Sequence, residues 1–286
     1  MDDKLLLRID SLLKHIDQVL KDTNGMSEKE LEESNLLLRA TCFSIAQIGE
    51  TMNHLEDSLS AKYDRLPWVG ARRMRNVIVH DYGNADVKQI YSTIQMDLPK
   101  LKRSFLAVRN DLITNTLLTG RLILRHIREN DVKAIYENWA SNPNVTRYVT
   151  WQTHKNIEET QQIVDRWLNE YKNPKTIRYG ITLKGEDKLI GAIDVVNYVD
   201  NKPEIGYCLS EKYWNKGYMT EACNSLVNYL FDIGYDTVII RANENNIASN
   251  KVIQKCGFDF DRKESMQIDS EQLTINCYKK TNQNLK

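Results

Sequence analysis

Up to about Asn110, hydrophobic residues recur every three or four positions, which is the spacing of one face of an α-helix. Two stripes of this kind each predict a long amphipathic helix. The first consists of Leu5, Ile9, Leu12, Ile16 and Val19, and the second of Leu38, Cys42, Ile45, Ile48, Met52 and Leu55. Because this half contains no convincing strand pattern, the sequence predicts an all-α helix bundle.

Local signals mark where further helices begin. Ser27 followed by Glu30 is typical of a capping box, in which the two residues bond each other's backbone N–H groups at a helix start. Pro67 stands at a suitable first position for another helix. A further helix fits residues 87–108, and Pro99 is expected to kink or divide it, because proline removes a helix hydrogen bond and crowds the preceding turn.

After the polar stretch 110–120, which we interpret as a short linker, the hydrophobic period changes to two. The second half is therefore predicted to be a mixed α/β domain, and we expect a helical domain over residues 1–112 followed by an α/β domain over residues 113–286. Strands are expected at 121–126, 178–183, 189–198, 204–209, 237–242 and 273–278, with helices at 132–141, 157–171, 220–233 and 247–256.

The composition narrows the function classes. Lys and Arg together number 39, as do Asp and Glu, so a broadly basic protein that coats nucleic acid is excluded. The five cysteines are odd in number and lack the paired spacing of a metal site, which indicates reduced thiols and no bound metal. Neither a signal-peptide pattern nor an apolar run of membrane-span length occurs, so we expect a cytoplasmic protein without a membrane partner.

The segment 213–222, Tyr-Trp-Asn-Lys-Gly-Tyr-Met-Thr-Glu-Ala, lies between a predicted strand and a predicted helix. A glycine at such a turn lets successive backbone N–H groups point into one concavity, and the N-terminal end of the next helix adds partial positive charge. Together they can hold a pyrophosphate, and Lys216 adds a cation. The alternative is ordinary turn chemistry, for which a glycine between strand and helix is equally typical.

Four segments, in this order, resemble the GNAT acetyltransferases, and in particular the subgroup that includes the ribosomal-protein N-terminal acetyltransferases. They are residues 119–125, 204–207, 214–222 and 246–258. The resemblance covers about residues 118–278 and implies the GNAT fold, with a mixed, mostly antiparallel sheet, and acetyl-CoA as cofactor. It also implies two splayed strands, near residues 207–209 and 238–241, with the cofactor's pantetheine arm between them.

The resemblance assigns roles to particular residues. Glu204 matches a frequently acidic position and is the candidate base that removes a proton from the acceptor amine through water; its alternative role is a solvated carboxylate at a strand edge. Asn246 would bond the pantetheine arm or a thiol-bound water, which is compatible with capping its helix. The implied cofactor-binding residues are Tyr207, Cys208, Leu209, Asn215, Lys216, Gly217, Tyr218, Met219, Thr220, Asn246 and Ser249.

Two positions depart from the family pattern. Many relatives carry a tyrosine, the acid that reprotonates coenzyme A, where this chain has Ile253. The acid is therefore unassigned, and Ser249 or a water molecule are the substitutes. Met219 replaces the usual glycine or alanine of the loop, which phosphate binding tolerates if only its backbone N–H is used. The acceptor stays open between a protein N-terminus, a small amine, an aminoacyl group and a lysine.

Residues 66–82 concentrate groups that suit phosphate chemistry. Asn76 and His80 are four residues apart and share a helix face, and Arg75 lies beside Asn76. A histidine exchanges protons near neutral pH and an arginine stabilises a pentacoordinate phosphate, so this set can cleave RNA without metal; the alternative for His80 is a hydrogen-bonded side chain near a helix end. Arg75 and His80 diverge by roughly 140° on an ideal helix, which calls for two copies across a dimer axis.

The Arg-x4-His-x-Tyr pattern of Arg75, His80 and Tyr82 resembles the HEPN superfamily, in its HepT-like toxin branch. The resemblance covers about residues 3–109. It implies a helical homodimer with a composite ribonuclease site in which Arg75 and His80 act and Asn76 supports them. In some members a partner nucleotidyltransferase, the antitoxin, adenylylates the motif tyrosine, which is Tyr82 here.

Two hypotheses for the whole chain follow. In the first, an acetyltransferase is joined to a working ribonuclease toxin of the toxin–antitoxin type, with RNA as its substrate. In the second, the helical domain is an inactive dimerisation or RNA-docking module that delivers the acetyltransferase to its amine acceptor. Retention of Arg75, Asn76, His80 and Tyr82 together favours the first hypothesis.

Overall fold

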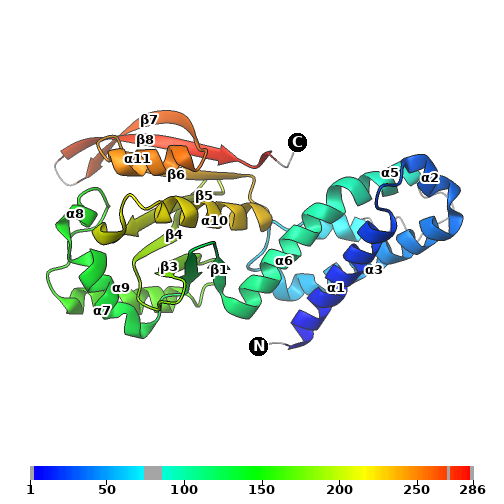
Figure 1. Ribbon diagram of the computed structural model, residues 1–286, viewed down its shortest axis with the longest axis horizontal. Helices are drawn as coiled ribbons and strands as arrows, with labels where there is room; N and C mark the ends of the chain where they lie inside the picture. Colours follow the sequence, from blue (N-terminus) through cyan, green and yellow to red (C-terminus); the bar gives the residue numbers. More distant parts are fainter. Residues whose placement is uncertain (1–2, 74–85, 269–270, 284–286) are drawn as a thin grey trace. The chain divides into compact units, whose positions relative to one another are not determined.

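The computed structural model describes residues 3–73, 86–268 and 271–283 (Figure 1). The chain forms two compact units. The first comprises residues 1–113 with 232–234, and the second comprises residues 114–231 with 235–286.

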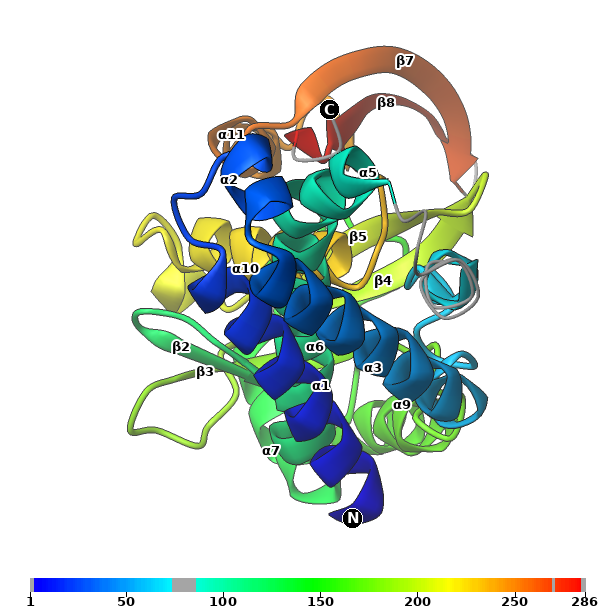
Figure 2. The same ribbon diagram turned by 90° about the vertical axis from the view of Figure 1, so that its right-hand side faces the viewer.

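The first unit is a helix bundle, as the sequence predicts. Helices α1 and α3 lie side by side (Figure 2) and bury both predicted apolar stripes. From Ile9 to Val19 and from Cys42 to Leu55, the stripe residues are at most 3% exposed. The helices are α1 (Asp3–Asp22), α2 (Glu28–Glu33), α3 (Asn35–Leu59), a segment over residues 68–73, α5 (Val87–Ser92), the π-helical turn η2 (Thr93–Asp97) and α6 (Leu98–Thr114).

The predicted capping box is confirmed at the start of α2. The Ser27 backbone N–H donates to the Glu30 carboxylate at 2.7 Å, and the Glu30 N–H donates to the Ser27 hydroxyl at 3.3 Å. These two bonds satisfy backbone donors that a helix start otherwise leaves without a partner.

Pro99 does not divide its helix. The chain stays helical from residue 87 to residue 114, but the turn directly before Pro99 is π-helical, and the Leu98 N–H bonds the Thr93 carbonyl five residues back. Proline lacks an N–H and its ring crowds the carbonyl four residues earlier. The wider π turn accommodates both effects, so the predicted division of the helix is wrong, and the chain instead changes its helix type locally.

A buried polar group ties the segment before residue 68 to α6. Asp111 is 1% exposed; its carboxylate accepts a hydrogen bond of 2.5 Å from the Tyr63 hydroxyl and pairs with the Lys62 ammonium at 2.6 Å. The Trp68 indole N–H donates to the Tyr63 carbonyl at 2.9 Å, and the Trp68 ring packs edge-on against Phe105. The start of the 68–73 helix is therefore held firmly within this unit.

The second unit is built on an eight-stranded sheet with the order β1-β2-β3-β4-β5-β6-β8-β7. Among the strands in the part of the chain that the structure describes, only β5 and β6 pair in parallel, so the predicted mixed, mostly antiparallel sheet is confirmed. The strands are β1 (Thr116–Leu118), β2 (Leu122–Arg125), β3 (Arg178–Leu183), β4 (Gly191–Val199), β5 (Lys202–Leu209), β6 (Thr237–Asn243), β7 (Asp259–Ile268) and β8 (Glu271–Thr281).

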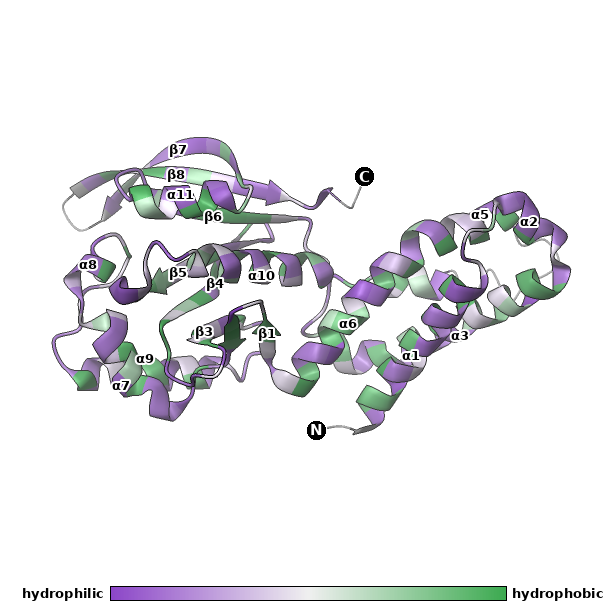
Figure 3. Ribbon diagram, in the orientation of Figure 1, coloured by the Kyte–Doolittle hydropathy of each residue, from purple (hydrophilic) through white to green (hydrophobic). Residues whose placement is uncertain are grey.

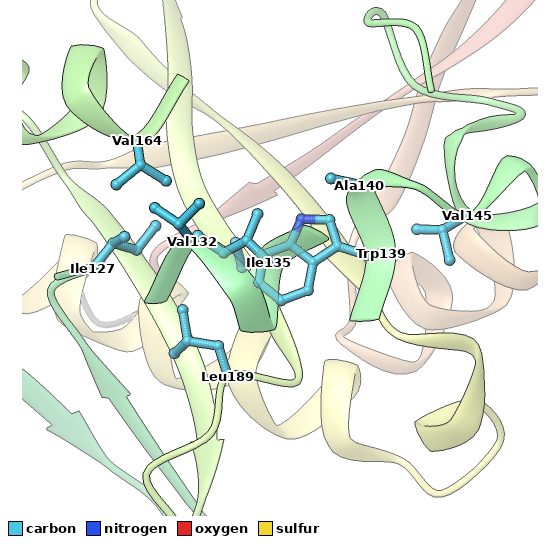
Figure 4. Packing of buried hydrophobic residues seen from close by; sticks show 9 residues of the cluster. Ile127, Val132, Ile135, Trp139, Ala140, Val145, Val164 and Leu189 are labelled. Atoms are coloured by element: carbon cyan, nitrogen blue, oxygen red, sulfur yellow. The ribbon is translucent and has the colours of Figure 1, made fainter. Parts of the chain in front are cut away.

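Helices connect these strands and complete the core. Trp139, 1% exposed, packs in a buried cluster with Ile135, Val164 and Leu189 (Figure 4). The segments between β2 and β3 are η3 (Glu129–Asp131), α7 (Val132–Ile135), the π-helical turn η4 (Tyr136–Ala140), α8 (Pro143–Thr146) and α9 (Ile157–Glu170). The later ones are η5 (Glu211–Tyr213) and α10 (Tyr218–Asp232), between β5 and β6, and α11 (Ile247–Lys255), between β6 and β7.

The predicted linker at 110–120 is wrong. Helix α6 continues to Thr114, a single residue, Asn115, adopts positive φ (46°), and β1 starts at Thr116.

The sequence also misses β7, whose residues are mostly charged or polar. Figure 3 shows β7 as hydrophilic and β6 as hydrophobic. An edge strand exposes much of its surface to water, so it lacks the apolar pattern by which an interior strand is found.

Candidate functional site

The parallel strands β5 and β6 separate in the middle of the sheet. They pair at only two positions, Glu204 with Ile239 and Ile205 with Ile240. Beyond these pairs β5 continues to Leu209 and β6 to Asn243 without pairing to each other. The predicted splay is thus present, but on β6 it begins at Arg241, three residues after the start of the predicted range 238–241. Because the two strands do not pair with each other along this gap, an extended ligand could bond backbone groups on its two sides.

The loop after β5 has the geometry of an anion site. Asn215 and Gly217 have positive φ, 60° and 79°, and α10 begins at Tyr218. The Glu221 N–H donates to the Gly217 carbonyl at 3.1 Å, and the N–H groups that precede this bond in the first helical turn point out of the helix end. Such a loop and helix start favour a bound phosphate, as the sequence predicts for residues 215–220.

Contacts on the β5 side fix the entrance to this loop. The Trp214 indole N–H donates to the Leu209 carbonyl at 2.7 Å. Asn142, which caps α8, and Asn144 within α8 donate from their side-chain amides to the Glu211 carboxylate, at 3.0 and 3.2 Å. The loop therefore starts from a fixed position at the end of the splayed strand.

On one side of the gap, β5 and α11 bring two hydroxyl groups together. The oxygens of Tyr207 and Ser249 are 2.9 Å apart. The Ser249 backbone N–H donates to the Asn246 side chain at 3.1 Å, which confirms that Asn246 caps α11; its contact with a cofactor stays a prediction. Burial raises the pKa of Tyr207, so its phenol is neutral. Ile253 is fully buried and supplies no acid.

The Cys208 thiol is an unreactive neighbour of this pair. Cys208 lies on β5 between Tyr207 and Leu209, and burial raises the pKa of its thiol to about 12. A thiol with so high a pKa stays protonated near neutral pH and is a poor nucleophile. The backbone of Cys208, not its sulfur, is therefore the part suited to ligand binding.

Glu204 lies one residue before the last paired position, at which Ile205 pairs with Ile240. It is 6% exposed, and its two carboxylate oxygens accept hydrogen bonds from Arg241 Nε at 2.7 Å and Nη2 at 2.9 Å. The alternative of a solvated strand-edge carboxylate is excluded, because β5 is an interior strand. The sequence analysis missed Arg241, although a lone cation in the apolar strand 237–242 is a signal for a buried partner of opposite charge.

The candidate ribonuclease residues Arg75, Asn76 and His80, together with Tyr82, lie outside the described residues. The segment that leads into them is described, and there Arg72 pairs with Glu56 of α3 at 2.9 Å. Two clusters of basic residues occur in this unit, Arg72 with Arg73 and Arg75, and Lys100 with Lys102 and Arg103. In the second cluster, Lys102 pairs with Asp17 of α1 at 2.6 Å. Two of the basic side chains of these clusters are therefore partly neutralised within the unit itself.

Two further properties bear on the site. In residues 3–73, 86–268 and 271–283, no group of three or more His, Cys, Asp or Glu side chains is arranged to hold a metal ion. Among the helices in that part of the chain, none combines the length and the apolar character that a membrane span requires.

Sequence comparison finds a known family in each half. The family described as acetyltransferase (GNAT) domain matches residues 121–259, and the family described as ribonuclease HepT-like matches residues 12–108. The uncharacterized N-acetyltransferase YoaA of Bacillus subtilis (strain 168) is 32% identical over 145 residues, which are 50% of this chain and 81% of YoaA. TTE0752 of Caldanaerobacter subterraneus subsp. tengcongensis, a predicted RNase, is 24% identical over 95 residues, which are 33% of this chain and 85% of TTE0752.

Solved structures share the fold of the second unit. A GNAT-family acetyltransferase from Bacillus anthracis has a TM-score of 0.52 and 25% identity, covering 58% of this chain and 98% of its own. RimL, the ribosomal L7/L12 α-N-protein acetyltransferase, in complex with coenzyme A, has a TM-score of 0.52 and 20% identity, covering 58% of this chain and 97% of its own. The splayed strands, the loop at 215–220 and these relatives agree: the chain belongs to the GNAT acetyltransferases, and ahead of the acetyltransferase domain its residues 12–108 match the HepT-like family.

Proposed function

We propose that the α/β domain transfers the acetyl group of acetyl-CoA to an amine. The observation that carries the proposal is the gap between β5 and β6, which ends at the anion-binding loop. The pyrophosphate would bind the backbone N–H groups of residues 215–220, and the pantetheine arm would lie along residues 207–209. Coenzyme A bound to RimL, which has the same fold, supports this ligand class.

In this proposal Glu204 is the base. A carboxylate offers about four lone-pair sites, and Arg241 uses two of them, so the others can accept a proton through a water. The amine nitrogen then forms a bond to the acetyl carbon, and the carbon–sulfur bond breaks. The departing thiolate needs a proton, and we assign this step to Ser249, whose hydroxyl is hydrogen-bonded to Tyr207 and would pass on a proton that it regains from water. Ile253 stands where the family has its tyrosine.

The acceptor class is an amine, either a protein N-terminus or a small molecule. RimL, by its name, acetylates the N-terminus of a ribosomal protein, and this supports a protein N-terminus as the first class to test. A panel of N-terminal peptides and small amines, assayed with the full chain and acetyl-CoA, would identify the acceptor.

Calorimetry on the full chain tests the cofactor. Gly217 and Gly185 both have positive φ, 79° and 85°, so alanine strains either backbone by a similar amount, roughly 1–2 kcal/mol. Only Gly217 lies in the loop. Gly217→Ala should weaken acetyl-CoA binding at least about tenfold, whereas Gly185→Ala should leave it unchanged. No heat of binding with the unchanged protein, or equal effects of both variants, would refute the proposal.

A second function is proposed for the helical domain, favoured by its match to the HepT-like ribonucleases and by relatives named as RNases. We propose that it forms a homodimer, that Arg75 and His80 of the two copies cleave single-stranded RNA without metal, and that Asn76 supports them. In a toxin–antitoxin arrangement, a nucleotidyltransferase would silence the site by adenylylating Tyr82. The competing proposal is an inactive module that dimerises or docks the enzyme on RNA.

A further inference from the structure

The turn between β1 and β2, at the edge of the sheet, is hydrogen-bonded to the start of α10. Thr119 and Arg121 lie between β1 and β2, about 100 residues before Glu221 in the first turn of α10. The Glu221 carboxylate accepts hydrogen bonds from the Thr119 hydroxyl at 2.5 Å, from the Arg121 backbone N–H at 2.7 Å and from Arg121 Nε at 2.7 Å. Three bonds to one carboxylate fix its position far more tightly than a surface ion pair does.

Arg121 also reaches the loop itself. Its Nη1 donates to the Lys216 carbonyl at 3.0 Å, and its guanidinium lies 4.5 Å from the centre of the Tyr218 ring. The peptide between Lys216 and Gly217 is planar and trans, so its C=O and N–H point in opposite directions. By holding the Lys216 carbonyl, Arg121 turns the Gly217 N–H away from itself.

The charge of Glu221 makes this arrangement informative. A carboxylate in the first turn of a helix lies close to where a pyrophosphate would bind, and by charge alone it would repel that ligand. Burial raises the pKa of Glu221, but the bonds from Thr119 and Arg121 outweigh this effect and lower it, so Glu221 is ionised. Because the negative charge of Glu221 disfavours a bound pyrophosphate, Glu221 must favour binding in some other way if this loop is the anion site.

We infer that Glu221 and Arg121 are positioning residues for the pyrophosphate loop: the turn before β2 clamps the loop and aims its N–H groups at the cofactor. This inference rests on the proposed acetyl-CoA site. Neither side chain needs to touch the ligand, because Arg121 acts through the Lys216 peptide and Glu221 acts through Arg121.

Glu221→Gln distinguishes a positioning role from a purely electrostatic one, because the two roles predict opposite changes in coenzyme A affinity. The amide can keep the oxygen that faces Thr119, but its NH2 group opposes Arg121 Nε, and two donors cannot bond. If Glu221 acts only by charge, its neutralisation strengthens coenzyme A binding. If Glu221 positions the loop, we expect coenzyme A affinity, measured by calorimetry on the full chain, to fall by at least about fivefold. Unchanged or increased affinity would overturn the inference.

Arg121→Lys and Arg121→Ala test the same clamp from its other end. Lysine keeps the charge but not the planar fork that bonds Glu221 and Lys216 together, so both variants should weaken coenzyme A binding about equally. Arg128→Ala is the matched control, because Arg128 pairs with Asp187 at 3.2 Å at a similar exposure, away from the loop. Full affinity in Arg121→Lys would show that charge alone suffices and would also overturn the inference.

A shorter ligand distinguishes a local clamp from general damage to the fold. 3′-Phospho-ADP contains the pyrophosphate of coenzyme A but lacks the pantetheine arm. The clamp predicts the same fold-loss for 3′-phospho-ADP as for coenzyme A in Glu221→Gln, whereas a disturbed gap between β5 and β6 predicts a larger loss for coenzyme A. If the unchanged protein binds neither ligand, the proposed function itself fails; if it binds both and the variants match it, only the clamp fails.

Discussion

Glu204 of β5 and Arg241 of β6 are joined by hydrogen bonds of 2.7 and 2.9 Å, one residue before and one residue after the last paired position of these two parallel strands. Directly beyond this pair the strands separate. The bidentate contact holds the carboxylate in one orientation at the entrance to the gap, which a flexible surface carboxylate could not achieve. The pair therefore combines a structural task, closing the paired part of the strands, with the chemical role that we propose for Glu204.

Glu204→Gln should lower the rate of acetyl transfer by about 100-fold, because a general base typically contributes a factor of that order. The loss should be largest at low pH, where the acceptor amine is protonated and needs a base. Affinity for acetyl-CoA should stay within about twofold, since the ligand groups lie beyond Ile205. A pH–rate profile with an accepted amine is the measurement.

Glu264→Gln is the control for this experiment. Glu264 also lies near Arg241, at 3.7 Å, but on β7 and outside the gap. It should leave the rate and its pH dependence unchanged. If Glu204→Gln has the same profile as the unchanged enzyme, the role of Glu204 is structural.

Ser249→Ala should slow acetyl transfer about tenfold or more if Ser249 protonates the departing thiolate. Tyr207→Phe removes the hydroxyl that lies 2.9 Å from Ser249 and should have a smaller effect of the same kind. The double variant should be no slower than Ser249→Ala alone, because the two hydroxyls act in one chain. Steady-state rates with a poor and a good thiol leaving group would check this. If Ser249→Ala does not slow the reaction with either one, water protonates the thiolate and Ser249 does not.

His80→Ala and Arg75→Ala should each abolish cleavage of single-stranded RNA by the full chain, and EDTA should not affect the unchanged protein. The measurement is cleavage of a labelled RNA, together with the oligomeric state, which should be a dimer. His54→Ala is the matched control, since His54 lies on α3 and pairs with Glu50. Cleavage that persists in His80→Ala, or a monomeric protein, would favour the docking module.

Tyr171→Phe should change how stability depends on alkaline pH. The Tyr171 hydroxyl donates to the Arg178 carbonyl and accepts from the Ile127 N–H, both at 3.0 Å, and burial raises its pKa to about 12. Below pH 10 the phenol is neutral in both states. Between pH 10 and 12 the unfolded chain loses this proton first, so the free energy of unfolding falls, by up to about 3 kcal/mol for this group.

Denaturant unfolding at several pH values measures this dependence. Tyr171→Phe should be less stable at pH 7, by about 1–3 kcal/mol, because the Ile127 N–H loses its acceptor. Its stability should then fall less steeply than that of the unchanged protein above pH 10. Parallel curves for the two proteins would contradict the assignment.

The sequence predicts most of the interior of this fold, because burial forces an apolar pattern on the residues involved. The bounds of β3 are predicted without error, and the stripes of α1 and α3 match the buried residues. Prediction fails where burial is incomplete, as in β7, and in the short β1 at the opposite edge. The π turn before Pro99 also escapes, since residues 93–97 carry no pattern that distinguishes it from an α-helix.

The contacts of the candidate site are likewise predictable only where they are local in the sequence. The loop around Gly217 and the cap at Asn246 are visible in the sequence because they depend on residues close together in the chain. The partner of Glu204 lies 37 residues away, and those of Glu221 about 100 residues away. Such partners are set by the register of the strands and the placement of turns, which no local pattern contains. Arg75, Asn76, His80 and Tyr82 stay predictions.

The gap between β5 and β6 gives this sheet a third edge, in its centre. At the outer edges, unpaired backbone groups meet water, but here they belong to strands that are each paired on their other side. An extended ligand that bonds them would act as an inserted strand and complete the ladder. Amide hydrogens of residues 206–209 that face the gap would then exchange with solvent quickly in the empty protein and slowly in the ligand-bound protein. The exchange rate of these backbone amides would therefore report whether the site is occupied.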